Sequence, residues 1–284
     1  MTNKIINTKD YLVTGESFKI SLDERTGVLK TTPTPNSESL KKYYQTKRYT
    51  SYTSTPKTAI ERAYVFVRKT RMAKKIKKIL NMLNDKGSLL DYGCGTGDFL
   101  LKAKNAGLSV AGIEPHQKAR EAATIKTGVK VFSSKESAET NSNKYDIITL
   151  WHSLEHVLDL EQTVVFLKNK LNPEGKIVVA APNHNSFDAK YYRDKWAAYD
   201  TPRHMWHFDQ TSIEKVFGSC GLVLIEKKTS FWDAFYVSIL SEKYKKSAFP
   251  YIKGAIIGKL SNFLSFFNGE SSAITYVFSR ASKK

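Results

Sequence analysis

The stretch LLDYGCGTGDFL at 89–100 places three glycines, at 93, 95 and 97, directly after an apolar run. An apolar run followed by glycines and an amphipathic segment predicts a strand, a tight loop and a helix. Backbone N–H groups and the positive helix end then meet at one point, where a ligand's polar edge can bind. Glycines are needed there because a Cβ would collide with a ligand lying against the main chain.

Downstream, strand-like and helix-like periods alternate, as they do in a parallel sheet covered by helices. After Pro182 the alternation breaks, and a polar, aromatic stretch precedes a helix that Thr211 and Ser212 are expected to cap. The predicted strands are 88–92, 109–113, 129–132, 145–150, 176–181, 222–228 and 273–280, and the predicted helices of the sheet region are 97–106, 116–126 and 160–171.

We expect an N-terminal extension at 1–57, made of short strands and loops with a segment that covers the cofactor. An amphipathic helix at 58–83 opens the main domain, 58–284, which carries insertions at 183–210 and 231–271.

The glycine spacing differs from the G-x-G-x-x-G of dinucleotide enzymes, and an acid, Asp91, stands two residues before Gly93. The run from Asp91 to Gly97 resembles motif I of the class I S-adenosylmethionine-dependent methyltransferases. The resemblance implies a Rossmann-like α/β fold with a seven-stranded, mostly parallel sheet, its last strand antiparallel and helices on both faces. It also implies S-adenosyl-L-methionine as the cofactor.

A second predicted strand delivers Glu114, 21 residues after Gly93, where a carboxylate suits the two ribose hydroxyls. The family's third strand usually supplies an acid to the adenine, but VFSSKES offers only Ser133 or Ser134. Tyr49 either faces the cofactor or packs on the amphipathic helix predicted at 58–83. The expected cofactor-binding residues are Asp91, Gly93, Cys94, Gly95, Gly97, Glu114, Pro115, Ser134, Leu150, Trp151 and Tyr49.

The segment WHSLEHV follows the fourth predicted strand and resembles the E-x-x-E-H segment of ubiquinone-biosynthesis O-methyltransferases, where acids and histidine bind a divalent cation. Here His152 replaces an acid, so we expect no metal. Glu155 and His156 are expected to fix the loop. His152 directly follows the strand and is a candidate catalytic base facing the acceptor.

The stretch DTPRHMWHF resembles a D-x-P-R-H-x-x-H-F signature of a broad bacterial branch of these enzymes. Either His204 or His207 could serve as the base. In the alternative, Asp200 and Arg203 simply pin this loop. No cysteine is near, which disfavours zinc.

Residues 15–35, GESFKISLDERTGVLKTTPTP, resemble the end of a small zinc ribbon found in many relatives. Asp23 and Thr26 occupy the cysteine positions, so the tract is expected to form a short hairpin without the metal.

The net charge is +18, and residues 1–88 carry 19 Lys and Arg against 7 Asp and Glu, which is +12. The excess fits either an anionic partner or a solvated basic surface. Residues 249–267 carry an apolar helical stripe. This stripe either rests on an anionic membrane as a peripheral contact, or it covers a sheet edge or forms a dimer contact.

Two cysteines are too few for a disulfide framework, and the N-terminus shows no apolar signal region, so we expect a cytoplasmic protein. On this resemblance we expect a methyltransferase that acts at oxygen on a small-molecule, sugar or lipid-linked acceptor, an anionic one included, as a monomer or homodimer. The alternatives are an RNA methyltransferase and a cofactor-binding protein without turnover. RNA is disfavoured because LWHSLEH lacks the N/D-P-P-aromatic arrangement that clamps a flipped base.

Overall fold

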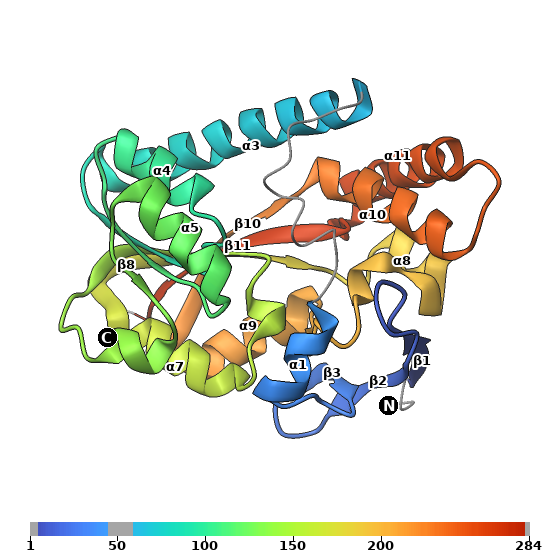
Figure 1. Cartoon of the computed structure of the whole chain (residues 1–284), viewed down its shortest axis with the longest axis horizontal. Coiled ribbons are helices and arrows are strands. Elements are labelled where there is room, and N and C mark those ends of the chain that lie inside the picture. Colours follow the sequence, from blue (N-terminus) through green and yellow to red (C-terminus); the bar gives the residue numbers. More distant parts are fainter. Residues whose placement is uncertain (1–4, 45–58, 282–284) are drawn as a thin grey trace. The chain divides into compact units, whose positions relative to one another are not determined.

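The computed structural model describes residues 5–44 and 59–281 (Figure 1). Residue contacts divide the chain into two compact units. The first unit comprises 1–46, 152–164 and 179–284, and the second comprises 47–151 and 165–178. Within the described ranges, no helix combines the length and apolar character needed to cross a membrane.

Seven strands form one sheet in the order β10-β11-β8-β7-β4-β5-β6. Strands β4 to β7 pair in parallel, and β11 runs antiparallel to β10, which confirms the predicted fold class. The strands are β4 (Ser88–Tyr92), β5 (Ser109–Ile113), β6 (Val131–Phe132), β7 (Tyr145–Trp151), β8 (Leu171–Pro182), β10 (Leu222–Thr229) and β11 (Ala273–Arg280).

All seven predicted strands are present, but β8 begins at Leu171, five residues before the predicted start at 176. The predicted helix 160–171 and the predicted strand 176–181 leave Asn172 and Pro173 between them, outside both elements. Instead they form the opening of the strand, where Asn172 is half-buried and Pro173 is exposed, a place where the missing N–H of proline disturbs the hydrogen-bond ladder least.

Counted in chain order, the strands of this sheet lie 3-2-1-4-5-7-6, so the order reverses between β4 and β7. In open α/β sheets, ligands bind outside the carboxyl ends of the strands at such a reversal. The register places Asp91 of β4 beside Gly112 of β5 and Thr149 of β7. The glycine loop therefore starts at the position where a ligand crevice is expected.

Helices of the second unit pack on this part of the sheet, with α4 against β5 and α5, and α3 against α4. Leu89, Ile113 and Ile147 are fully buried beneath them. The helices between the strands are α3 (Ala59–Leu83), α4 (Asp98–Asn105), α5 (Gln117–Thr127), α6 (Lys135–Glu139), α7 (Leu160–Lys170) and α9 (Gln210–Ser219).

The cap of α9 differs from the prediction. Asp209, not Thr211 or Ser212, is the N-cap residue, and its side chain accepts a hydrogen bond from the Ser212 N–H. The Ser212 hydroxyl oxygen in turn accepts a hydrogen bond from the Asp209 N–H, which completes a capping box.

The first unit has a separate antiparallel sheet in the order β1-β2-β3-β9. Its strands are β1 (Ile6–Lys9), β2 (Ser17–Asp23), β3 (Val28–Thr32) and β9 (Trp206–His207), and α1 (Ser37–Tyr43) follows β3. The β2–β3 pair is the predicted hairpin. In its turn, Asp23 Oδ1 accepts hydrogen bonds from the Thr26 N–H and hydroxyl, both at 2.9 Å. These two side chains thus close the turn at the positions that cysteines hold in zinc ribbons.

The two long insertions contain helices of the first unit. The earlier one holds α8 (Phe187–Tyr192) and two short 3₁₀ turns at Arg193–Lys195 and Ala197–Tyr199. The later one holds α10 (Phe231–Tyr244) and α11 (Pro250–Asn268), which pack against each other (Figure 1). The helical stripe predicted at 249–267 is confirmed as α11.

Candidate active site

The glycine loop is fastened to the end of the neighbouring strand. The backbone N–H groups of Gly93 and Cys94 both donate to the Ile113 carbonyl, at 2.8 and 3.1 Å. Gly93, Gly95 and Gly97 have φ values of 78°, 55° and 79°, in the left-handed region that side chains disfavour. The loop conformation is therefore one that glycine is required to form.

Gly95 and Gly97 have different surroundings. A Cβ on Gly97 would lie 3.0 Å from the Ala123 Cα, so this glycine permits α5 to pack closely. A Cβ on Gly95 would meet nothing within 4 Å. Gly95 is thus the position in the loop where the main chain borders open space, as a ligand lying on the backbone requires.

Glu114 lies where the sequence predicts the ribose acid, directly after β5. Its Oε2 accepts a hydrogen bond from the Gly95 N–H and its Oε1 accepts one from the His116 N–H, both at 2.9 Å. Burial raises the pKa of this carboxyl despite the two backbone bonds. Arg120 holds the carbonyls of Glu114 and Pro115, at 2.9 and 3.0 Å. Because a carboxylate has about four lone-pair sites, Glu114 can still accept bonds from a diol.

Asp91 is only 2% exposed and accepts a hydrogen bond from the Thr149 hydroxyl at 2.6 Å. Burial raises the pKa of Asp91 to about 7, although the Thr149 bond and the charge of Lys75 oppose the rise. The nearby Glu114 carboxylate raises it further. A cationic ligand beside Asp91 would relieve this burial cost, so the site favours a positively charged group over a phosphate.

The end of β7 supplies an aromatic ring, Trp151, and α3 supplies a cation, Lys75, that lies over it. The Lys75 ammonium lies 3.8 Å from the centroid of a Trp151 ring, and Phe99 meets Trp151 edge to face. The indole Nε1 of Trp151 is buried and has no hydrogen-bond partner in the described part of the chain. Leu150, the residue before it, is fully buried.

The remaining expected cofactor residues stand as follows. The Ser134 hydroxyl serves as the N-cap of α6, in a capping box with Ser137. Cys94 is buried and free, and burial raises the pKa of its thiol, so it is a poor nucleophile. Tyr49 lies outside the described residues.

In the first unit, Glu155 is 1% exposed and forms no hydrogen bond to any described residue through either carboxylate oxygen. Its Oε1 lies 3.6 Å from His152 Nδ1. Burial alone would raise the pKa of Glu155, but the neighbouring histidines, His152 foremost, outweigh it and lower the pKa to about 2. Glu155 is therefore a buried anion at neutral pH.

His156 and His204 pack edge to face, with ring centroids 4.6 Å apart. Nδ1 of His156 lies 2.9 Å from the Arg203 carbonyl, and Nδ1 of His204 lies 2.8 Å from the Ala198 carbonyl. A carbonyl only accepts, so each Nδ1 carries the proton and each Nε2 keeps a lone pair. Burial lowers the pKa of His156 to about 4, so it is neutral at physiological pH.

Glu155, His156 and His204 form the one group in the described part of the chain whose donor atoms could hold a metal ion together, all within 4.8 Å of one another. Two imidazole nitrogens whose partner N–H groups are tied to carbonyls, with one carboxylate, suit a borderline ion such as zinc. From the sequence no metal was expected here: His152 stands in place of an acid, and the lack of a nearby cysteine disfavoured zinc at His204.

His207 is 4% exposed, and its Nε2 lies 2.8 Å from the Thr31 hydroxyl. Burial holds the pKa of His207 well below its usual value. This environment suits a histidine that fixes β9 beside β3.

Arg203 is fully buried between two acids. Its Nη2 donates to Asp200 at 2.7 Å and to Asp10 at 2.9 Å, and its Nη1 donates to the Tyr43 carbonyl at 3.0 Å. These are the bonds expected of a residue that pins the loop. Asp10 was not predicted from the sequence, because no motif links residues so far apart in the chain.

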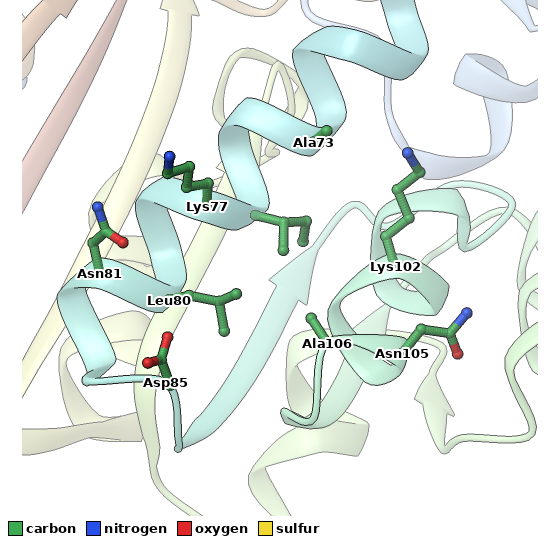
Figure 2. Close-up of a pocket in the computed structure, with 9 residues that line it drawn as sticks. Ala73, Lys77, Leu80, Asn81, Asp85, Lys102, Asn105 and Ala106 are labelled. Carbon is green, nitrogen blue, oxygen red and sulfur yellow. The ribbon is translucent and has the colours of Figure 1, made fainter.

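A hollow of about 550 Å³ lies between α3 and α4 (Figure 2). It borders the last turn of α4, at Lys102, Asn105 and Ala106, whereas the glycine loop meets the first turn. A helix of this length spans about 12 Å. None of the expected cofactor residues that the structure describes lines this hollow, so we do not assign it to the candidate site.

Comparison with solved structures identifies the fold. The chain matches a magnesium protoporphyrin IX methyltransferase from Synechocystis PCC 6803 with a TM-score of 0.58 and 11% identity, over 87% of this chain and 100% of that one. It also matches the [4+2]-cyclase SpnF with a TM-score of 0.56 and 14% identity, over 88% and 99% of the two chains. At these identities the likeness shows the fold alone.

Sequence comparison is more specific. A ubiquinone biosynthesis O-methyltransferase of Aromatoleum aromaticum is 33% identical over 104 residues, which cover 34% of this chain and 44% of the relative. The chain thus spans less than half the length of this curated relative. A family model described as a methyltransferase domain matches residues 64–227, more than half of the chain. By this match, and by the Asp91–glycine loop–Glu114 arrangement that lies inside it, the chain belongs to the methyltransferase-domain family.

Proposed function

We propose that this protein is an S-adenosyl-L-methionine-dependent methyltransferase that acts on an oxygen of a small-molecule acceptor. The observation that carries the proposal is the arrangement of Asp91, Gly95 and Glu114. A buried acid with a pKa of about 7, a glycine facing open space and a second acid bonded to that glycine stand together at the reversal of the sheet.

Each of these residues has a distinct role in holding the cofactor. Asp91 balances its positive charge, the Gly95 backbone makes room for its chain, and Glu114 accepts bonds from the ribose hydroxyls. When bound, the cofactor supplies an electrophilic methyl group on a sulfonium.

The proton of the acceptor hydroxyl passes, on this proposal, to His152. This residue directly follows Trp151 in the chain, and its side chain is 36% exposed, so an acceptor can reach it. Buried, ionised Glu155 stabilises the imidazolium that forms, as a carboxylate does behind the histidine of a catalytic triad. Methyl transfer is an in-line displacement, so positioning supplies much of the rate and the base a smaller part.

The likeness to ubiquinone biosynthesis O-methyltransferases supports oxygen as the methylated atom. The matched region covers less than half of that relative, so the class of acceptor is itself part of this proposal. Two cysteines, Cys94 and Cys220, are too few for a disulfide framework, which fits a reducing compartment, and we place the reaction in the cytoplasm.

Calorimetry with S-adenosylmethionine, S-adenosylhomocysteine and NAD tests the cofactor site. We expect micromolar binding of the first two and none of NAD. Methyl-labelled cofactor is then incubated with fractionated cell extract. Label in the small-molecule or lipid fraction supports the proposal, and label in RNA would favour the RNA alternative. Cofactor binding without any transfer would identify a protein that binds the cofactor without turnover.

A further inference from the structure

The two helices of the late insertion are packed through their smallest residues. On α11 the buried positions are Gly254, Gly258, Ser261 and Ser265. A Cβ on Gly254 would lie 2.5 Å from the Ile239 Cα of α10, closer than real atoms approach. The backbones of α10 and α11 therefore touch through small side chains, as paired helices do in membrane proteins.

The large apolar side chains of α11 lie on its opposite side and face solvent. Residues spaced three or four apart share one face of a helix, and a stripe with this spacing runs the full length of α11. Phe266 is 86% exposed and Phe267 is 71% exposed. The exposed stripe consists of Phe249, Ile252, Ile256, Leu260, Phe263 and Phe267, with Phe266 beside it. It covers no sheet edge, because the side chains themselves are open to water.

Aromatic residues of α10 add to the same helical pair. Phe231, Trp232 and Tyr236 are all exposed, at 56%, 46% and 44%. Exposed apolar residues scattered singly are normal on a protein surface, but a run of this length on two contacting helices is not. Trp, Tyr and Phe are also the side chains that favour the boundary between water and lipid.

Specific bonds hold this face outward. The Ser261 hydroxyl, on the buried side of α11, donates to Asp188 of α8 at 2.7 Å. Asn262 donates to the Phe231 carbonyl at the start of α10, at 2.8 Å. Rotating α11 to bury its phenylalanines would break both bonds and push large side chains against the α10 backbone. The exposure is thus part of the folded state.

The two helices and their connection also carry positive charge. Residues 231–268 contain five lysines and two acids, and one of those acids, Glu242, is buried. Lys253 and Lys259 are exposed on α11 within the stripe's length. A second copy would bring the same lysines together, whereas an anionic lipid surface would be attracted to them.

We propose that the α10–α11 pair lays this apolar face into the surface of an anionic lipid bilayer, with its lysines at the headgroups. Binding then draws on the apolar area that leaves water and on the attraction between lysines and anionic lipids. The inference does not depend on the proposed methyl transfer, because it rests on a separate part of the chain.

The test is sedimentation of the full chain with vesicles of phosphatidylglycerol and phosphatidylcholine, or of phosphatidylcholine alone, without cofactor. The wild-type protein is expected to bind the anionic vesicles at least about tenfold more tightly than the neutral ones. The double substitution Ile256→Asp, Phe263→Asp should lower the affinity for anionic vesicles by about tenfold or more. Lys253→Gln with Lys259→Gln should lower it as well, by about fivefold per lysine.

Ile125→Asp is the matched control, since Ile125 is 85% exposed on α5, outside the pair. It should bind as the wild type does. Thermal unfolding by circular dichroism checks that every variant is folded. Wild-type protein that fails to sediment with anionic vesicles would overturn the proposal, as would a folded double variant that binds unchanged. The proposal would also be overturned if the wild-type protein is a dimer that does not bind vesicles and the double substitution makes it monomeric.

Discussion

Glu114 Oε2 accepts a hydrogen bond from the Gly95 N–H at 2.9 Å, so the acid that ends one strand fixes the loop that follows its neighbour. Its other oxygen is held by the His116 N–H. The carboxylate is therefore oriented before any ligand arrives, and little side-chain entropy remains to be lost when a diol binds.

Glu114→Gln should weaken binding of S-adenosylmethionine by about 10- to 100-fold, because a hydrogen bond to a charged group contributes about 1.5–3 kcal/mol. Calorimetry measures the loss. Glu121→Gln is the control, since Glu121 is exposed on α5 and its carboxylate bonds only to the Gln117 side chain among the contacts in the described chain. Equal affinities in both variants would exclude the ribose role of Glu114.

Gly95→Ala should abolish cofactor binding by filling the space beside the loop. Gly107→Ala provides a close match, because Gly107 also has a positive φ, at 90°, and also has nothing within 4 Å of a Cβ. Each substitution should destabilise the fold by about 1 kcal/mol through backbone strain. In calorimetric titrations with S-adenosylmethionine, only Gly95→Ala should lose binding. If both variants lose it equally, backbone strain is the cause.

Cofactor affinity should depend on the protonation of Asp91. The pKa of this acid in the free protein is about 7, and its charged form attracts a cationic ligand. Affinity should therefore rise between pH 6 and pH 7 and level off by pH 8. Asp91→Asn should bind weakly at every pH, and calorimetry across this range would show whether the slope disappears.

The same substitution should stabilise the cofactor-free protein. A carboxyl whose pKa is raised by folding takes up protons in the folded state, so stability falls as pH rises from about 4 to 7. Asp91→Asn removes this cost, on the order of 1 kcal/mol or more at pH 8. Thermal melts at pH 5 and pH 8 check this, because the gain should be larger at pH 8. A variant that is less stable at pH 8 would contradict the raised pKa.

The sequence predicted the sheet well because each of its signals is local. Asp91, the glycines and Glu114 stand at strand ends whose positions follow from apolar runs of four or five residues. Where the prediction missed, contacts between distant segments decide the outcome. Trp206 and His207 form a strand only because β3 lies beside them, and two residues carry no periodicity of their own.

The histidine segment shows the same limit. From the sequence, His152, His204 and His207 were equivalent candidates for the base. The fold separates them, because His207 is buried and bonded to Thr31, His204 is bonded to the Ala198 carbonyl, and the His152 side chain is 36% exposed and lies 3.6 Å from the buried Glu155 carboxylate. Burial and long-range partners make this distinction, and neither is written in a local pattern.

Arg203→Met should be strongly destabilising, because it leaves the buried carboxylates of Asp10 and Asp200 without their cation. Breaking a buried ion pair in this way costs about 3–5 kcal/mol. Arg25→Met is the control: Arg25 pairs with Glu161 on the surface, where such pairs contribute less than about 1 kcal/mol. Denaturant unfolding monitored by fluorescence gives both values.

The ion pairs of Arg203 also predict a pH dependence. Arg203 holds the pKa values of Asp10 and Asp200 below their usual range, against the effect of burial. Depressed carboxyl pKa values give stability that is present above about pH 4 and lost as pH falls through the folded-state values. The wild-type protein should therefore lose stability below pH 4 more steeply than Arg203→Met. An equally steep loss of stability below pH 4 in the two proteins would contradict this role of Arg203.

His152→Gln should lower turnover by about a hundredfold or more while cofactor affinity stays within about twofold, because the residue is proposed to take a proton and not to hold the cofactor. Glu155→Gln should lower turnover too, and the double variant should be little worse than either single one, since the two side chains act as a unit. Single-turnover assays with labelled cofactor measure the three rates. The same assays are then run with a chelator and with added zinc. They distinguish proton transfer to His152 from catalysis by a metal ion held by Glu155, His156 and His204. If a chelator abolishes the activity and zinc restores it, Glu155 is a metal ligand and does not act as the partner of the His152 base.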